Sequence, residues 1–206
     1  MKGVRSIIKS EFPSHLKEDV KTVAAYLSQE LSEGIRHGIS EQYIEMRLLD
    51  GEKIRFPYRF YFKDEHVTFP AEFTKEQRCI YHCIYTRHYN GYIREKHVTS
   101  LLLEYPEELP DWVCSYLLSL SGEYIMEILE RLYEMLSPRK NETIQAMSQM
   151  NSQQFLYIHD RMISYWNEFY RGRCPRYKQY IGKKLFEVCY GYTRRMEKQR
   201  IFVVEA

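Results

Sequence analysis

The sequence predicts a mainly α-helical protein of about six helices, an α-helical array or bundle, with one small antiparallel β-hairpin. Apolar residues recur at spacings of three and four along most of the chain, which is the period of an α-helix. Two short runs alternate apolar and polar residues on either side of Asp50-Gly51, which is typical of a hairpin. Pro and Gly residues between the periodic runs predict where helices end.

The first half of the chain predicts three helices around the hairpin. Ser14 can cap the first helix with its hydroxyl group. Thr74 and Gln77 have the spacing of a capping box, so the second helix is expected to begin there. Asn90-Gly91 suits a left-handed stop after the second helix, and a third helix is expected over residues 93–103.

The hairpin is the best-specified local element of the sequence. Asp50-Gly51 predicts a type I′ turn, in which both central residues have positive φ. Pro57 has no N–H to donate, so the second strand is expected at a sheet edge or with a bulge. Residues 201–204 form a β-prone run that could add a third strand to the hairpin.

A broad apolar face over residues 111–136 predicts a central helix, which Ser121-Gly122 can bend or split. Residues 137–148 are polar and are expected to form a connector with at most a short helical turn. The length suits a single domain over residues 1–206, with a candidate internal boundary at 137–150.

Two helices are predicted after this connector. The fifth begins near Asn151 and carries one apolar face, formed by Phe155, Ile158, Met162, Trp166 and Phe169. The sixth follows Cys174-Pro175 and has helical spacing of Tyr177, Ile181, Leu185, Val188 and Tyr192.

The composition predicts a cytoplasmic protein that is rich in tyrosine. Five cysteines without regular spacing do not suggest a disulfide framework. No apolar run is long enough for a signal-peptide core or for a membrane-spanning helix, so no membrane contact is expected. Nineteen tyrosines suit the edge of a small helical core, and tyrosine is also enriched at protein interfaces.

Charge is distributed unevenly along the chain. Residues 101–137 hold eight acidic residues and one basic residue, whereas residues 171–200 hold ten basic and two acidic residues. The two segments could pack together and neutralise one another. Alternatively, the basic segment could face a polyanion.

The sequence contains one weak candidate for a metal site. Cys79, His82 and Cys83 share a helical face, and thiolate and imidazole groups bind zinc. A zinc site needs a fourth ligand, for which His97 is the nearest residue, so three core residues are the simpler interpretation. Cys174 has positive neighbours that favour a thiolate, but no glycine-rich cradle follows it. We therefore expect no metal and no other cofactor.

Basic and aromatic residues form two candidate binding sets. The first is Arg87, Tyr89, Tyr92 and Arg94, and the second is Arg171, Arg173, Arg176, Tyr177 and Lys178. Such residues bind phosphates and stack on unpaired bases, but they also cover the rim of a core. The chain pI near 8.2 lies below the value above about 9 that is typical of dedicated nucleic-acid binders.

Three functions remain open at this point. The favoured one is a non-catalytic helical interaction domain with a protein partner or self-association, because no catalytic motif is present. The second is binding of RNA or single-stranded DNA through the basic, tyrosine-rich C-terminal third. The third is a metal- or thiol-dependent enzyme, in which a nucleophile and a base would meet only in space.

Overall fold

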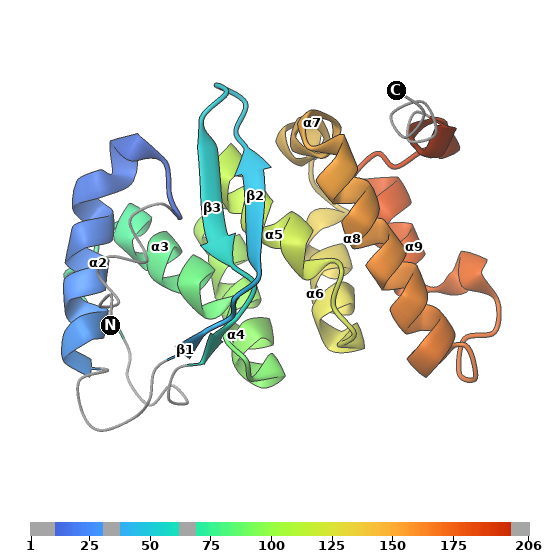
Figure 1. Cartoon of the computed structure of the whole chain (residues 1–206), viewed down its shortest axis with the longest axis horizontal. Helices are drawn as coiled ribbons and strands as arrows, with labels where there is room; N and C mark the ends of the chain where they lie inside the picture. The colour runs from blue at the N-terminus through green and yellow to red at the C-terminus, as the bar shows by residue number, and fades with distance from the viewer. Residues whose placement is uncertain (1–10, 31–37, 62–68, 199–206) are drawn as a thin grey trace. The chain divides into compact units, whose positions relative to one another are not determined.

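The computed structural model describes residues 11–30, 38–61 and 69–198, and these residues are mainly helical, as the sequence predicted (Figure 1). The chain divides into two compact units, Met1–Pro106 and Glu107–Ala206. The prediction of one domain, with a candidate boundary at 137–150, stays a prediction. Residues 137–150 lie within the second unit.

Unit 1 begins with α2, which spans Lys17–Glu30. Ser14 does not cap this helix, because residues Ser14–Leu16 form a 3-10 turn before it. The Ser14 N–H instead donates a hydrogen bond to Glu52 Oε1 at 2.8 Å. The contact joins the start of α2 to the tip of the hairpin.

The predicted capping box is confirmed at the start of α3, which spans Lys75–Tyr85. Asn90-Gly91 plays a different part from the one predicted. Asn90 has a φ of −76° and its side chain accepts a hydrogen bond from the Tyr92 N–H, so it caps the start of α4, Gly91–Glu104. The prediction was wrong because α3 already ends at Tyr85 and a short turn separates the two helices.

The predicted hairpin is confirmed as β2 (Tyr43–Arg47) and β3 (Lys53–Pro57), paired antiparallel. Its turn is not type I′, because Gly51, with a φ of 94°, is the one hairpin residue with positive φ. The Gly51 N–H donates to Leu48 O, and the Leu48 N–H donates to Glu52 O. This pattern is a three-residue loop in which a left-handed glycine follows a tight turn.

The apolar face of the hairpin is buried, and Pro57 lies in an edge strand of this two-stranded sheet, as expected. A second small sheet, not predicted, pairs β1 (Gly38–Ile39) with β4 (Phe60–Tyr61). Phe60 of β4 also bridges to His88 in the turn after α3. The third strand predicted over residues 201–204 lies outside the described residues.

The core of unit 1 is built around α3. This helix packs against both α2 and α4, and every residue from Cys79 to Tyr85 is buried. A helix that is covered on two sides buries a wide face, which explains why its polar His82 is also enclosed.

In unit 2 the predicted central helix is split into α5 (Asp111–Leu120) and α6 (Met126–Leu136). Ser121 Oγ is within hydrogen-bond distance of the Tyr190 hydroxyl at 2.7 Å and also donates to Leu117 O. A Cβ atom on Gly122 would lie 3.2 Å from Ile158 O, so the chain closely approaches α8, which spans Ser152–Tyr165. The helix is therefore interrupted by tertiary contacts at Ser121 and Gly122, the two residues predicted to bend or split it.

The connector predicted over residues 137–148 is wrong, because α7 spans Glu142–Met150. Ile144 and Met147 are buried on this helix, which packs against α5 and α8. Helix stability in a protein comes mostly from packing of the apolar face, so these buried residues explain why this mostly polar segment is helical.

The predicted fifth helix is α8, Ser152–Tyr165, which continues as a π-helical turn over Trp166–Tyr170. The predicted sixth helix is interrupted. Its residues form a 3-10 turn (Tyr177–Gln179), α9 (Ile181–Lys184) and a second π-helical turn (Leu185–Cys189). The core of unit 2 is centred on α5, in which every residue from Trp112 to Leu120 is buried.

Candidate binding surfaces

The first predicted set lies around the turn between α3 and α4, and its two arginines are interior residues. Arg87 and Arg94 are 0% and 1% exposed. Arg94 Nη1 donates hydrogen bonds to His88 O at 2.7 Å and to Tyr89 O at 2.8 Å. Arg87 Nη2 donates to Tyr58 O at 2.6 Å. Both guanidinium groups therefore hold the backbone of this region.

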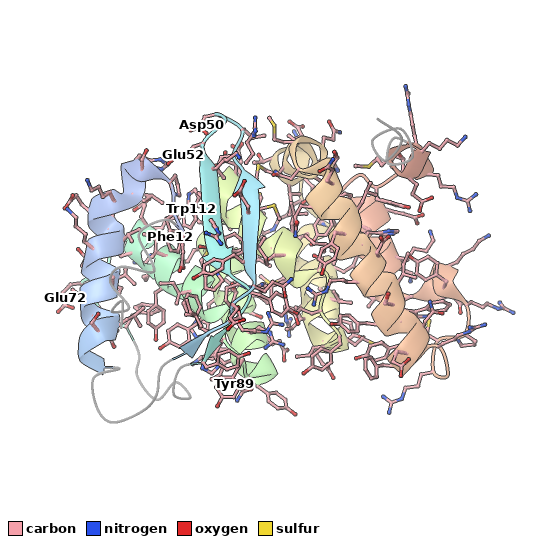
Figure 2. All side chains as sticks on the ribbon, in the orientation of Figure 1. Phe12, Asp50, Glu52, Glu72, Tyr89 and Trp112 are labelled. Atoms are coloured by element: carbon pink, nitrogen blue, oxygen red, sulfur yellow. The ribbon has the colours of Figure 1, made fainter. Side chains whose placement is uncertain are left out.

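The two tyrosines of this set are at the surface. Tyr92 is 83% exposed, and Tyr89, labelled in Figure 2, is 47% exposed. The Tyr89 ring stacks on Tyr61 of β4 with 6.0 Å between ring centroids. The structure thus separates this set into buried cations and exposed rings.

A series of stacked rings lies behind this turn. His88 is buried between Tyr85 and Tyr89, with ring centroids 5.9 and 4.7 Å away. Further inside, His82 Nδ1 and His97 Nδ1 are 2.8 Å apart. One of these two rings must donate the proton of that hydrogen bond while the other accepts it.

The weak metal candidate gains no support from its geometry. Cys79, His82 and Cys83 are all buried, and His82 is paired with His97. No group of three or more metal-ligating side chains occurs among residues 11–30, 38–61 and 69–198. Burial raises the pKa of the Cys79 thiol to about 12, so this thiol is protonated at neutral pH.

The second predicted set forms an exposed loop between α8 and α9, here called the basic loop (residues 171–178). Arg171, Arg173, Arg176 and Lys178 are exposed. Tyr177 is half-buried, and its ring lies 5.0 Å from that of Trp166. None of the four cations forms an ion pair with any residue that the structure describes. Mutual neutralisation by direct pairing with the acidic segment is therefore not seen at this loop.

Next to the basic loop lies a group of four rings, three exposed and one half-buried, that the sequence did not predict as a group. This aromatic stripe consists of Tyr124, Tyr157, Tyr165 and Phe169. Ring centroids are 5.9 Å apart for Tyr124 and Tyr165, 6.3 Å for Tyr124 and Phe169, and 6.1 Å for Tyr165 and Phe169. Tyr124, Tyr157 and Phe169 are 49%, 45% and 56% exposed.

Arg161 lies between two tyrosines of the stripe. Its guanidinium carbon is 5.9 Å from the centroid of Tyr157 and 5.7 Å from that of Tyr165. Arg161 Nη2 also donates to the Tyr165 hydroxyl at 3.2 Å. Cation–π contacts of this kind hold the arginine and both rings in place.

The prediction that Phe169 belongs to the core face of the fifth helix is wrong. In a regular α-helix Phe169, three residues after Trp166, would lie on the same face as Trp166. The π-helical turn over Trp166–Tyr170 widens the last turn, so Phe169 faces solvent while Tyr170 is half-buried. The spacing of Tyr157, Arg161, Tyr165 and Phe169, four residues each, was the sequence signal for this face.

Tyr170 connects the stripe to the basic loop. Its hydroxyl donates a hydrogen bond to Tyr124 O, which fixes the segment that carries the Tyr124 ring. Burial raises the pKa of Tyr170, the nearby Glu127 carboxylate raises it further, and Arg173 lowers it. Charges of both signs therefore lie close to this end of the stripe.

Among the described residues of unit 2, the Cys174 side chain contacts a backbone carbonyl group and His159 packs against an aromatic ring. Cys174 Sγ donates to Arg176 O at 3.7 Å, and Trp166 Nε1 donates to Cys174 O at 2.9 Å. His159 is buried against Tyr192, with 4.0 Å between ring centroids. Burial lowers the pKa of His159, because an enclosed site disfavours the charged imidazolium form.

Comparisons of the chain with protein-family models, with curated proteins and with solved structures find no match. Within the described part of the chain, no helix combines the length and the apolar character that crossing a bilayer requires. The candidate surfaces must therefore be judged on their geometry and charge.

Proposed function

We propose that the protein is a non-catalytic helical interaction domain that binds a protein partner through the aromatic stripe and the basic loop of unit 2. The observation that carries the proposal is the meeting of two exposed rings, Tyr124 and Phe169, with the half-buried ring of Tyr165. They lie beside four exposed cations that form no ion pair with any described residue. Tyrosine and arginine are the residue types that most often dominate binding energy at protein interfaces.

The size of the exposed rings favours an interface. An aromatic side chain has roughly 150–250 Å² of surface, and burial yields about 25 cal/mol per Å². Covering the exposed half of each ring in Tyr124, Tyr157 and Phe169 would therefore contribute on the order of 2 kcal/mol per ring before the costs of association.

The stripe is also ordered before any partner arrives. Tyr165 contacts Tyr124, Phe169 and Arg161, and the Tyr124 backbone is held by Tyr170. Side chains that already occupy one arrangement lose less conformational entropy on binding. Such a surface can bind more tightly than the same residues on a flexible segment.

Binding of RNA or single-stranded DNA is the second candidate, and it is favoured by the four exposed cations of the basic loop, which have no ion pair among the described residues. Two carboxylates argue for a protein instead. Glu127 is exposed near Tyr170, and Glu168 is exposed next to Phe169. Carboxylates within the ring surface repel a phosphate backbone, but they can accept hydrogen bonds from a protein.

Photocrosslinking tests the proposal directly. A photoreactive phenylalanine analogue at position 169 is expected to form a covalent adduct with a protein in cells of the natural host. The same analogue at Leu103, an apolar residue of unit 1 that is 67% exposed, is the control outside the stripe. Adducts from both positions in equal yield, or from neither, would contradict the proposal. An adduct that nuclease digestion removes would instead support the second candidate.

A further inference from the structure

We infer that the partner is an acidic amphipathic peptide segment, whose apolar side chains cover the aromatic stripe and whose carboxylates meet the basic loop. This inference rests on the proposed function and names the chemistry of its partner.

The charge of the basic loop is uniform. From Phe169 to Tyr180 the chain contains four cations and no acidic residue. All four are exposed and none is paired within the described ranges. Arginine binds carboxylates through two parallel N–H···O contacts, so Arg171, Arg173 and Arg176 suit carboxylate partners. A partner segment that carries carboxylates could form ion pairs with these exposed guanidinium and ammonium groups.

The rings of the aromatic stripe and the cations of the basic loop lie in a fixed order, so the partner must carry apolar and acidic residues in the matching order. Tyr157, Arg161, Tyr165 and Phe169 follow one another along α8 and its π-helical turn, a length of about 18 Å at the rise of an α-helix. The basic loop begins two residues after Phe169. The partner segment therefore has apolar residues over a similar length and acidic residues concentrated at one end.

A peptide fits this surface better than a nucleic acid does. A nucleic acid carries a phosphate at every nucleotide and would bring negative charge along the whole stripe, past Glu127 and Glu168. A peptide can place its carboxylates only at the basic loop and uncharged residues at the two glutamates. Charge complementarity over the whole surface therefore selects the peptide.

Selection from a display library of random peptides of about 12 residues tests the inference, because a helix of that size matches the stripe. The full-length chain is the bait. Selected peptides are expected to be enriched in Asp and Glu together with aromatic or aliphatic residues. Their affinity for the chain is then measured by fluorescence anisotropy.

Two triple variants separate a specific contact from a general charge effect. The R171E/R173E/R176E variant reverses three charges of the basic loop and is expected to weaken peptide binding by at least about tenfold. The R194E/R195E/K198E variant reverses three exposed charges of the same unit outside the loop and is expected to change binding by less than about threefold. Circular dichroism and the thermal midpoint check that both variants are folded.

Other experimental results would contradict the inference alone, or the inference together with the proposed function. Selected peptides without an acidic excess, or equal weakening by both triple variants, would overturn the inference and leave the proposed function intact. Failure to select any peptide that F169A weakens would overturn the proposed function as well. Tighter binding of oligothymidylate or oligouridylate than of the acidic peptides would overturn both in favour of nucleic acid.

Discussion

Two arginine- and tyrosine-rich segments differ in whether their arginines are buried. One is the turn between α3 and α4 with the start of α4, and the other is the basic loop between α8 and α9. Both combine arginine and tyrosine residues over a short stretch of chain. In the first, Arg87 and Arg94 are enclosed and donate to backbone carbonyl groups. In the second, Arg171, Arg173 and Arg176 are exposed and have no ion pair among the described residues.

The difference shows that an arginine-rich pattern does not by itself indicate a binding surface. A buried guanidinium group costs desolvation energy, so it is stable inside only where several acceptors surround it. Carbonyl groups of the irregular turn supply acceptors to Arg94, whereas the basic loop offers its cations to solvent. Only exposed cations are available to a partner.

The largest expected effect in this comparison is the truncation of Arg94. Arg94→Ala removes the donors to His88 O and Tyr89 O in the interior, and the free energy of unfolding is expected to fall by about 3 kcal/mol. Urea denaturation followed by circular dichroism measures this change. Arg173→Ala is the matched control and is expected to change stability by less than about 0.5 kcal/mol. An equal decrease in the free energy of unfolding in the two variants would contradict the distinction between buried and exposed arginines.

A smaller effect is expected when the positive charge is kept but its shape is changed. The Arg87 guanidinium group lies over the rings of Tyr58 and Phe56, at 5.3 and 5.9 Å from their centroids. Lysine cannot reproduce the planar, multiple-donor contact, so Arg87→Lys is expected to lower the free energy of unfolding by about 1–2 kcal/mol. Arg176→Lys, in the basic loop, should be neutral in the same urea titration. A neutral Arg87→Lys would show that charge alone is needed there.

Unit 2 also encloses the titratable side chain of His159. Unlike the buried arginines Arg87 and Arg94, a histidine can be neutral inside the protein. The pKa of His159 is lowered by burial, so the unfolded chain takes up a proton more readily than the folded one. The stability of unit 2 is therefore expected to be complete above about pH 6.5 and to fall as the pH drops through that value towards the lower folded pKa. Denaturant midpoints above and below about pH 6.5 measure this change. His159→Phe should flatten the dependence, and an unchanged slope in this variant would exclude His159 as its source.

The smallest effect on stability is expected in the aromatic stripe. Phe169 is 56% exposed, and Phe169→Ala is expected to change the free energy of unfolding by less than about 0.5 kcal/mol. Phe155→Ala, at a buried ring of the same helix, is the matched control and is expected to cost about 3–5 kcal/mol. A large loss of stability for Phe169→Ala would mean that the ring belongs to the core and would weaken its assignment to a binding surface.

Local sequence patterns predicted much of the fold. The capping box of Thr74 and Gln77 acts through neighbouring residues, so its outcome depended little on the rest of the chain. The alternation around Asp50-Gly51 likewise placed β2 and β3 correctly, because strand faces follow from a period of two. The turn type was missed, since a three-residue loop with a left-handed glycine uses the same residues as the type I′ turn.

The candidate site was predicted only in part. The basic loop was found because its cations are neighbours in sequence. The stripe was missed because Tyr124 comes from a segment far along the chain, and because a π-helical turn moved Phe169 away from its predicted face. The four-residue spacing from Tyr157 to Phe169 was visible, but nothing in it distinguishes an exposed stripe from a buried one.

The sequence by itself determined the helical class, the hairpin and the starts of α3, α5 and α8, because these depend on hydrophobic period and, at α3, on side chains that cap the adjacent backbone. The tertiary structure alone decided which arginines are inside, where the central helix splits and which rings face solvent. Those outcomes depend on groups brought together from distant segments, as Tyr190 meets Ser121 and Tyr170 meets Tyr124. Burial is a property of the packed chain, and a local pattern does not contain it.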